Sequence, residues 1–266
     1  MISIIGYGFV GKAVHAAFPG ATCLIDPLLG TSLSDIDKET TYAFICVPTP
    51  SNSDGSIDDG IVLETVTYLL QNTSAKIIIK STILPSTIDK INSFFIGRIC
   101  INPEFLTERR AVEDMLNAET IVIGGDDRNI REAVWDLYAN ESRCKALNAS
   151  FVSLREACWI KYITNTMLAA KVALLNEYYS EIGNRNSWDR IIKVLQKDDR
   201  LGTSHWLVPG SDGKFGFGGA CFPKDLNALL HKTQNLSILE IVKQSNDKIR
   251  KQYELDEREQ SQGIKF

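Results

Sequence analysis

The chain has 266 residues, which is enough for one large domain or two modest ones at roughly 150 residues per domain. Apolar residues make up 44% and charged residues 23%, a composition that supports a packed core and excludes a disordered chain. With 29 basic and 33 acidic residues the formal net charge is −4, which argues against general binding to nucleic acid or to an anionic membrane.

The N-terminus and the cysteines indicate a protein of a reducing compartment. Met1 leads directly into the apolar residues 2–5 without a basic leader, so we expect no signal peptide. No apolar run reaches the roughly 18 residues that a transmembrane helix needs. Three of the six cysteines, Cys23, Cys46 and Cys100, lie in apolar runs, where a thiol packs as a small hydrophobe. We therefore expect six thiols, a cytoplasmic location and no membrane partner.

The first 150 residues alternate short apolar runs with amphipathic stretches. The apolar runs predict strands at residues 2–5, 22–25, 43–47, 76–79, 98–101 and 120–123. The amphipathic stretches predict helices at residues 10–18, 60–71 and 129–138. Such alternation is typical of parallel strands joined by crossover helices. We therefore predict an α/β fold whose N-terminal domain, residues 1–150, is a Rossmann-like doubly wound parallel sheet.

The remaining residues, 151–266, carry no further strand signal and predict an all-helical domain. Residues 153–182 predict a long central helix that is apolar on more than one face, through side chains such as Ile163 and Met167. We favour a homodimer through this helix; the alternative is that the domain's own helices cover it. We also predict a helix at residues 188–196, a glycine-rich loop at 201–220, a final helix at 223–247 and a frayed polar tail at 251–266.

The first strand leads into the pattern of a dinucleotide-binding turn. Gly6-Tyr7-Gly8-Phe9-Val10-Gly11 has the form G-x-G-x-x-G between a predicted strand and a predicted helix. Glycines there permit a tight turn and close approach of a pyrophosphate to the helix N-terminus. Asp26 ends the second strand, where a carboxylate accepts hydrogen bonds from an adenosine ribose and repels a 2′-phosphate. The pattern predicts NAD as the cofactor; the alternative is a glycine turn with an incidental Asp26.

A cysteine that starts a helix is the second dense signal. It lies in the segment Gly216-Phe217-Gly218-Gly219-Ala220-Cys221-Phe222-Pro223-Lys224-Asp225. Pro223 suits the first turn of a helix, which places Cys221 at the helix N-terminus. That position and Lys224 both favour a thiolate, and the glycines leave a substrate room to approach. Asp225 is either a proton acceptor or a partner for Lys224. We interpret Cys221 as a nucleophile; the alternative is a buried cysteine beside a helix cap.

Two polar residues share one face of the predicted long helix. Lys161 and Asn165 are four residues apart, and helical residues at that spacing are neighbours. An ammonium that faces inward from an apolar helix needs a reason, because burying a charge is costly. Binding of an oxyanion is one such reason. A salt bridge to Glu156 or Glu104 is the alternative.

The segments that follow the predicted strands should line a common crevice. Ligand sites of open α/β sheets form beyond the carboxyl ends of the strands. Glu104 and Glu108 follow the fifth strand, where a carboxylate can activate water or can cap the next helix. Val47-Pro48-Thr49-Pro50 and Lys80-Ser81-Thr82 follow the third and fourth strands, so we expect them to line the same crevice.

Taken together, these segments resemble the UDP-glucose/GDP-mannose dehydrogenase family of nucleotide-sugar 6-dehydrogenases. The matching segments span nearly the whole chain in the family's order and are residues 6–11, 46–50, 80–82, 102–108, 161–165, 199–202 and 217–225. The resemblance implies a four-electron oxidation of a sugar C6 alcohol to a carboxylate, with NAD consumed twice. UDP-glucose is the expected substrate. The alternatives are another nucleotide sugar, such as GDP-mannose or a UDP-N-acetylhexosamine, and a truncated NAD-binding partner subunit with little activity.

The resemblance also implies chemical roles. Cys221 would form a thiohemiacetal and then a thioester, while Lys161 and Asn165 would stabilise the oxyanions. Asp225, through a water, would assist deprotonation of the alcohol. The expected catalytic residues are Cys221, Lys161, Asn165, Asp225, Glu104 and Thr82.

Glu104 would activate the hydrolytic water, Thr82 would help to hold it, and Arg200 would reach the substrate across a dimer. No metal is expected. The cofactor-binding residues that the resemblance implies are Gly6, Tyr7, Gly8, Phe9, Val10, Gly11, Asp26, Val47, Pro48, Thr49, Ser81, Thr82, Glu108 and Lys224. The substrate-binding residues are Glu104, Phe105, Leu106, Lys161, Asn165, Arg200, Phe215, Gly216, Phe217, Gly218 and Gly219.

Longer members of this family continue past the final helix into a second Rossmann-like domain that closes the cleft. The sequence printed here stops after that helix and a polar tail, so the resemblance is to a short form without the C-terminal UDP-binding domain.

Overall fold

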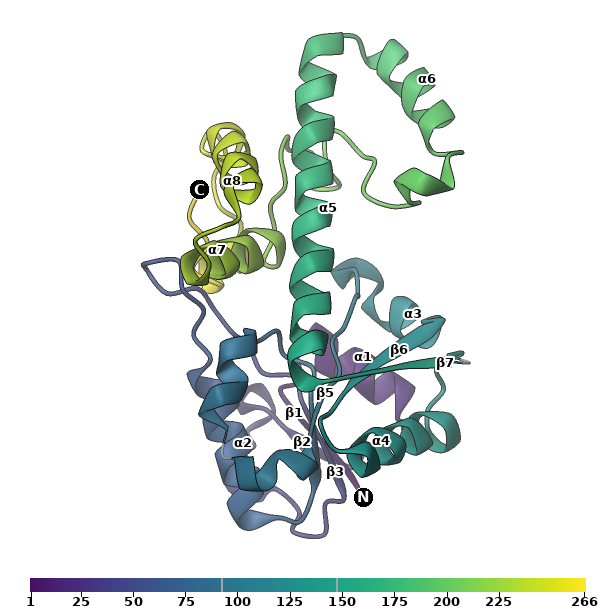
Figure 1. Ribbon diagram of the computed structural model, residues 1–266, viewed down its shortest axis with the longest axis vertical. Helices are drawn as coiled ribbons and strands as arrows, with labels where there is room; N and C mark the ends of the chain where they lie inside the picture. Colours follow the sequence, from purple (N-terminus) through teal and green to yellow (C-terminus); the bar gives the residue numbers. More distant parts are fainter. Residues whose placement is uncertain (92, 147) are drawn as a thin grey trace. The chain divides into compact units, whose positions relative to one another are not determined.

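The computed structural model describes residues 1–91, 93–146 and 148–266 and contains two compact units (Figure 1). The first unit comprises residues 1–49 and 58–161, and the second comprises residues 50–57 and 162–266. The division falls within the long helix α5 (Leu154–Ile182), whereas we expected the domain boundary at residue 150. All six cysteines are thiols. Within the described residues no helix is long and apolar enough to cross a membrane.

The first unit is built on a seven-stranded sheet with the order β2-β1-β3-β4-β5-β6-β7. The strands β1 to β5 are parallel, whereas β6 runs antiparallel to β5 and parallel to β7. The predicted Rossmann-like sheet is therefore confirmed, but our prediction of parallel strands throughout is wrong at β6, which runs antiparallel to β5. The strands are β1 (Ile2–Ile5), β2 (Cys23–Ile25), β3 (Tyr42–Ile45), β4 (Lys76–Ile79), β5 (Ile99–Ile101), β6 (Thr120–Gly124) and β7 (Asn148–Val152).

The strand β7 was not predicted. Its residues Asn148-Ala149-Ser150-Phe151-Val152 are exposed or half-buried, because β7 is the last strand in the sheet order. An edge strand of this kind lacks the continuous apolar run that marked the buried strands.

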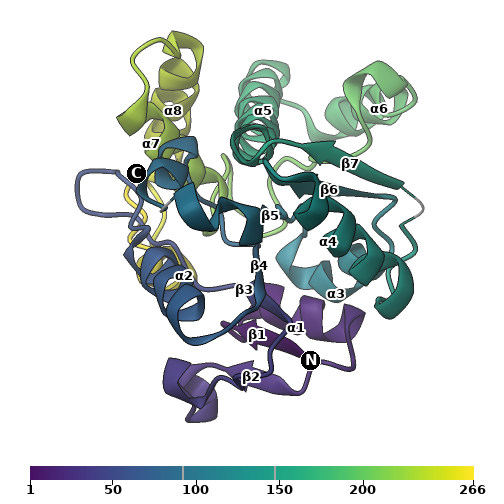
Figure 2. The ribbon, with the colours of Figure 1, turned by 60° about the horizontal axis from the view of Figure 1, so that its bottom comes forward.

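Helices cover both faces of the sheet (Figure 2). The helices α1 (Phe9–Ala17), α3 (Ala111–Leu116) and α4 (Arg128–Glu141) pack on the face that carries Phe44 and Ile78. The helix α2 (Gly60–Asn72) and the first residues of α5 pack on the opposite face, which carries neighbours such as Ile45, Ile77 and Ile79. Alternate residues of each strand thus enter two different cores, which explains why the central strands carry runs of successive apolar residues. Short 3-10 helices in this unit are η1 (Pro27–Leu29), η2 (Leu33–Asp35), η3 (Pro85–Lys90), η4 (Ser93–Arg98) and η5 (Glu108–Arg110).

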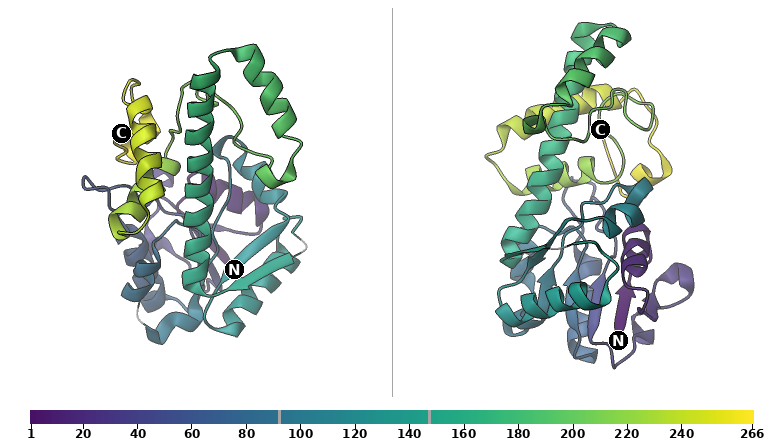
Figure 3. Two further views of the ribbon diagram at one scale, coloured as in Figure 1. Left: turned by 45° about the horizontal axis from the view of Figure 1, so that its top comes forward. Right: turned by 90° about the vertical axis from the view of Figure 1, so that its right-hand side faces the viewer.

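The second unit is helical, as predicted, and is arranged around the C-terminal part of α5 (Figure 3). Trp188 and Ile192 of α6 pack with Leu175 of α5, while Leu226 of α7 packs with Ala169 of α5. The other elements of the unit are α6 (Arg185–Leu195), η6 (Asp199–Leu201), α7 (Phe222–Lys232), α8 (Ser237–Arg250) and α9 (Glu257–Ser261).

The final helix is two helices rather than the single one predicted over residues 223–247. α7 ends at Lys232, and Thr233 adopts an extended backbone while its N–H donates to the carbonyl of Leu229. The side-chain hydroxyl of Thr233 donates to the same carbonyl, at 2.8 Å. A short polar side chain that competes for backbone hydrogen bonds is a common reason for a helix to end.

The tail also differs from our expectation, because residues 251–266 are packed rather than frayed. Glu259 in α9 is 0% exposed and Ile264 is 2% exposed. Asp256 and Glu259 form a reciprocal capping box at the start of α9, which satisfies two backbone donors of a helix of only five residues. The composition of the tail is polar, but its few inward-facing side chains have partners within the second unit.

Candidate active site

The glycine-rich turn after β1 has two packed glycines and one open glycine. Gly6 has φ +89°, and a Cβ there would lie 2.6 Å from the carbonyl carbon of Cys46. A Cβ on Gly11 would overlap the carbonyl oxygen of Gly6. A Cβ on Gly8 would meet nothing within 4 Å, and α1 begins at the next residue, Phe9. The turn therefore leaves open space at Gly8, in front of a helix N-terminus that attracts phosphate.

The carboxylate of Asp26 lies beside this turn. It follows β2 and accepts hydrogen bonds from the N–H of Tyr7 at 2.6 Å and from the N–H of Leu28 at 2.8 Å. Ionised carboxylate oxygens have about four lone-pair positions in all, so two backbone donors do not exhaust them. Asp26 thus fixes the turn and keeps lone pairs for further hydrogen-bond donors.

The segments after β3 and β4 are joined by a hydrogen bond. The hydroxyl of Ser81 donates to the carbonyl of Val47 at 2.7 Å. Pro48 is exposed, Thr49 is buried and Thr82 is half-buried. As predicted, these residues follow the carboxyl ends of the neighbouring parallel strands β3 and β4. The strand order reverses direction next to them, between β1 and β3, and ligands of open α/β sheets bind at such a point.

Lys161 and Glu104 form a buried ion pair in the first unit. The ammonium of Lys161 lies 2.9 Å from Oε1 of Glu104 and also donates to the backbone carbonyl of Glu104 at 2.5 Å. The second carboxylate oxygen of Glu104 accepts the N–H of Leu106 at 2.7 Å. The ring of Phe105, which is 44% exposed, lies 5.6 Å from the ammonium. The salt-bridge alternative is thus the one observed for Lys161, and it fixes the carboxylate of Glu104 at the end of β5.

Lys80, which we expected in the crevice, belongs to a buried polar cluster with Asn102 and Tyr138 that was not predicted. The ammonium of Lys80 donates to Oδ1 of Asn102 at 2.9 Å, and the hydroxyl of Tyr138 donates to the same oxygen at 2.6 Å. Burial lowers the pKa of Lys80 and raises the pKa of Tyr138 well above its usual value. A lysine directly after the apolar run 77–79 was the available signal, because a charge at the end of a buried strand needs a partner.

Glu108 lies apart from Glu104, at an exposed position that begins η5. It lines a surface cavity of about 750 Å³ together with Phe9 and Lys12 of α1. Glu108 therefore shares a concave surface with the helix that starts at the glycine-rich turn.

In the second unit Cys221 is the N-cap residue of α7, with Pro223 in the first turn, as predicted. Asp225 is 1% exposed and accepts two hydrogen bonds of 2.6 Å, one from the ammonium of Lys224 and one from the side-chain amide of Asn165. The structure thus brings together three of the expected site residues one turn into the helix that Cys221 caps. Of the two alternatives for Asp225, the partnership with Lys224 is observed.

The loop that leads to Cys221 is held by side chains that the sequence analysis did not single out. The N–H groups of residues 215, 216, 217 and 219 donate to Tyr253, Asn176, Asn246 and Glu259 in that order, at distances from 2.7 to 3.3 Å. Asn176 of α5 and Asn246 of α8 are buried, and amides on inward-facing positions of helices were the available signal.

Only one glycine of this loop faces open space. A Cβ on Gly216 would lie 2.7 Å from Oδ1 of Asn246, and a Cβ on Gly218 would overlap the guanidinium of Arg250. A Cβ on Gly219 would meet nothing within 4 Å. We expected the glycines to leave room for a substrate. This expectation is wrong for Gly216 and Gly218, which are small because neighbouring side chains pack against them.

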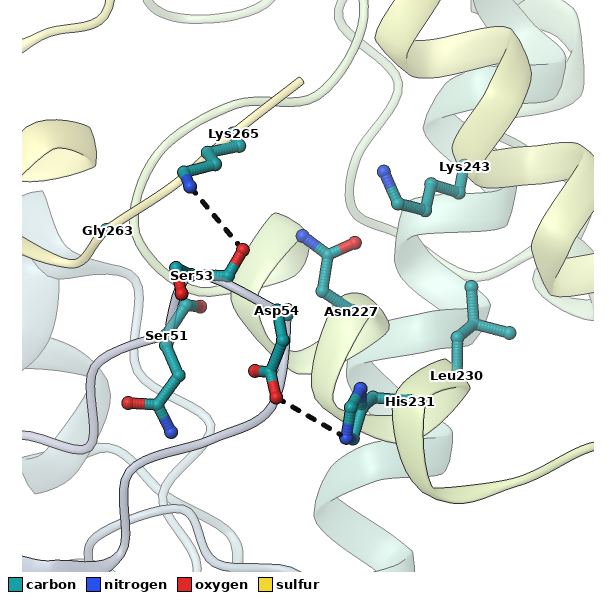
Figure 4. A pocket seen from close by; sticks show the side chains of 11 residues that line it. Ser51, Ser53, Asp54, Asn227, Leu230, His231, Lys243, Gly263 and Lys265 are labelled. Atoms are coloured by element: carbon teal, nitrogen blue, oxygen red, sulfur yellow. Dashed lines mark hydrogen bonds and ion pairs between the residues drawn. The ribbon is translucent and has the colours of Figure 1, made fainter.

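The second unit also contains the exposed Arg200 and a surface cavity. Arg200 in η6 has a side chain that is 87% exposed and ion-paired with Asp198 at 2.6 Å. A cavity of about 280 Å³ lies between residues 51–55, α7, α8 and the C-terminal segment, and Lys243 and His231 are among the side chains that line it (Figure 4). None of the residues named in the sequence analysis lines this cavity.

Models of two domains of one family match the chain, in the order expected from its segments. The NAD binding domain of the UDP-glucose/GDP-mannose dehydrogenase family matches residues 29–142, and the central domain of the same family matches residues 155–248. The chain belongs to the UDP-glucose/GDP-mannose dehydrogenase family. The first match makes NAD the cofactor of this family's N-terminal domain. This match begins at residue 29, after the glycine-rich turn at residues 6–11. The turn therefore supports NAD binding independently of the match.

The individual proteins that the chain resembles are dehydrogenases of the same kind. A UDP-glucose 6-dehydrogenase of Haloferax volcanii is 29% identical over 86% of the chain, and one of Rickettsia bellii is 35% identical over 79% of it. These matches cover 64% and 50% of the two relatives, so the chain spans between one half and two thirds of their length. A UDP-glucose dehydrogenase structure from Pyrobaculum islandicum has the same fold, with a TM-score of 0.75 at 24% identity over 94% of this chain and 68% of that one. In terms of the dehydrogenase family, Cys221 and Asp225 lie in the central domain, and Glu104 lies in the NAD binding domain.

Proposed function

We propose that this chain oxidises the C6 alcohol of a nucleotide sugar to a carboxylate in an NAD-dependent reaction, with UDP-glucose as substrate and UDP-glucuronate as product. The observation that carries the proposal is Cys221 at the N-terminus of α7. One turn later in α7, the buried Asp225 accepts hydrogen bonds from Lys224 and from Asn165 of α5. A helix N-terminus favours a thiolate, and buried polar side chains that converge on one place are typical of catalytic sites.

NAD, when bound, accepts a hydride from the sugar carbon. The open position at Gly8 before the N-terminus of α1 fits a pyrophosphate, and Asp26 fits an adenosine ribose. We assign the contacts with the cofactor to residues 6–11, Asp26, the segments after β3 and β4, Glu108 and Lys224.

The first oxidation converts the alcohol to an aldehyde. In our proposal Asp225, acting through a water, accepts the hydroxyl proton while a hydride leaves the same carbon. Lys161 and Asn165 stabilise the negative charge that develops on the oxygen.

The second oxidation takes place on Cys221. The thiolate forms a carbon–sulfur bond with the aldehyde, whose oxygen takes a proton to give a thiohemiacetal. Loss of that proton and of a second hydride gives a thioester. Glu104, with Thr82, activates a water that attacks the thioester, so the carbon–sulfur bond breaks and a carboxylate and the thiolate leave. In sum, one alcohol, two NAD⁺ and one water give one carboxylate, two NADH and three protons.

The proposal also includes the sugar site and a homodimer. We assign the substrate to residues 104–106, Lys161, Asn165, the loop 215–219 and Arg200. Large apolar side chains of α5 are exposed on one stripe of the helix, among them Ile163 at 49%, Met167 at 67% and Leu174 at 50%. A second copy of the chain would bury this stripe, which fits an isologous contact between two copies of α5.

The test is NADH formation by the purified chain with NAD⁺ and a panel of nucleotide sugars. We expect two NADH for each UDP-glucose consumed, and none with Cys221→Ser. Turnover with GDP-mannose or a UDP-N-acetylhexosamine alone would replace the substrate in the proposal. NAD binding without NADH from any sugar would overturn the proposed activity.

A further inference from the structure

Glu259 connects the C-terminal segment to the loop that ends at Cys221. It is 0% exposed and lies in the five-residue helix α9. Its Oε1 accepts the N–H of Gly219 at 2.9 Å and the guanidinium of Arg250 at 2.8 Å. Its Oε2 accepts the N–H of Asp256 at 3.0 Å, so both oxygens are engaged.

Arg250 extends this connection to the start of the same loop. It is 1% exposed, and its second terminal nitrogen donates to Asp212 at 2.8 Å. Its aliphatic carbons lie so close to Gly216 that a Cβ there would approach them to 3.2 Å. One guanidinium therefore joins Asp212, before the glycine loop, to the carboxylate that holds Gly219 at its end.

The segment that carries Glu259 is itself anchored. Its carbonyl at Gln262 accepts the N–H of Ser51 at 2.9 Å, and a Cβ on Gly263 would lie 2.5 Å from the carbonyl oxygen of Ser51. Figure 4 shows Gly263 and Lys265 beside Ser51 and Ser53, with the ammonium of Lys265 bonded to the carbonyl of Ser53. The buried side chain of Ile264 completes the anchor. A fixed carboxylate is thus available at Gly219.

We propose that Glu259 is a positioning residue for the nucleophile: through Gly219 and Arg250 it holds the loop that sets where Cys221 stands. The proposal rests on the proposed function of Cys221. Gly219 is two residues before Cys221, has φ +75°, and its N–H is held by the buried carboxylate of Glu259. Displacement of a reacting group by about 1 Å can cost a factor of about 100 in rate, even when its cause is remote.

The test compares Glu259→Ala, Glu259→Gln and Glu259→Asp with Glu257→Gln as control. Glu257 is an exposed acid in the first turn of the same helix. Gln keeps an acceptor oxygen at the same reach, Asp keeps the charge but withdraws it by one methylene, and Ala removes both. We expect kcat to fall about tenfold or more in Glu259→Ala while KM and the Kd for NAD⁺ change less than about twofold. We expect Glu259→Gln to return within about threefold of the parent chain, Glu259→Asp to lie between, and Glu257→Gln to match the parent.

A second readout needs no turnover. The rate of alkylation of Cys221 by iodoacetamide, followed by peptide mass spectrometry without substrate, reports the surroundings of the thiol directly. We expect it to change severalfold in Glu259→Ala and Glu259→Asp and to stay at the parent value in Glu259→Gln and Glu257→Gln. If Glu259→Ala does not fold, Glu259→Asp carries the comparison. If no sugar is turned over, the proposed function fails, but the alkylation rates still decide the positioning role. Parent-like alkylation and kcat in a folded Glu259→Ala or Glu259→Asp would overturn it.

Discussion

The ammonium of Lys161 lies 2.9 Å from the carboxylate of Glu104, and each side chain is only 7% exposed. The sequence favoured Lys161 as an oxyanion binder on a helix and Glu104 as a base after a strand, with a salt bridge between them as one alternative. Their pairing means that a change to either residue acts on the charge of the other. Kinetic effects of variants at Lys161 must therefore be read together with stability.

We expect Lys161→Met to destabilise the first unit strongly. Removing one partner of a buried ion pair leaves an uncompensated charge, which costs about 3–5 kcal/mol. Glu104→Gln should cost less, about 1–2 kcal/mol, because Lys161 keeps the amide oxygen and the backbone carbonyl of residue 104 as acceptors. Urea unfolding measures both, with Lys12→Met as an exposed control. A loss in Lys161→Met as small as that of the control would contradict the buried pair.

The glycine-rich turn predicts opposite outcomes for two similar substitutions. Gly8→Ala should fold as the parent chain does, because its Cβ meets nothing within 4 Å, but should weaken NAD⁺ binding at least about tenfold by filling the space left for a pyrophosphate. Gly11→Ala should unfold or destabilise the protein, because its Cβ overlaps the carbonyl of Gly6. Thermal unfolding and calorimetric titration with NAD⁺ separate the two effects. Unchanged NAD⁺ affinity in Gly8→Ala would place the cofactor elsewhere.

We expect Asp26 to set the preference of the chain for NAD⁺ over NADP⁺. Asp26→Asn keeps an acceptor for the N–H of Tyr7 but removes the charge that would repel a 2′-phosphate. We expect the ratio of the two Kd values to shift toward NADP⁺ by about tenfold, close to 1.4 kcal/mol. Fluorescence titration with both cofactors measures this ratio. A ratio equal to that of the parent chain would show that Asp26 only supports the turn.

The buried thiols predict a selective reaction of Cys221. Burial raises the pKa of Cys100 and of Cys158 to about 12 from an ordinary value of 9.0. At pH 9 about one thousandth of these thiols is ionised in the folded protein, so alkylation should modify the half-buried Cys221 before Cys100 and Cys158. The same shift makes folding less favourable above pH 9, since the unfolded chain releases these protons at lower pH than the folded one does. Time-resolved peptide mapping tests the order, which fails if Cys100 or Cys158 reacts as fast as Cys221.

Much of the fold was predictable because buried parallel strands and amphipathic helices leave local patterns. Ile4, Ile5 and residues 77–79 are apolar at successive positions because both faces of the sheet are covered. The strand at 148–152 was not predictable in the same way, because it lies at an edge and is mostly exposed. The break after Lys232 depends on one threonine, whose influence a propensity argument does not resolve.

The candidate site was predictable where function itself leaves a motif and not where it depends on distant partners. Cys221 and Gly8 were marked by their neighbours in the sequence. The hydrogen bonds of Gly219 to Glu259 and of Phe217 to Asn246 join residues that are 40 and 29 positions apart. A polar tail gives no local sign of such contacts, and for this reason residues 251–266 were taken to be frayed. Burial of Glu259 became evident only from the packed chain.

The central claim is that the second oxidation occurs on Cys221 and that Glu104 activates the water that ends it. The most direct measurement is peptide mass spectrometry of Glu104→Gln after reaction with NAD⁺ and UDP-glucose. We expect a glucuronyl thioester on Cys221 that persists in this variant, is removed by hydroxylamine and is absent from Glu104→Gln/Cys221→Ser. Steady turnover in Glu104→Gln at the rate of the parent chain, with Cys221 unmodified, would contradict the account.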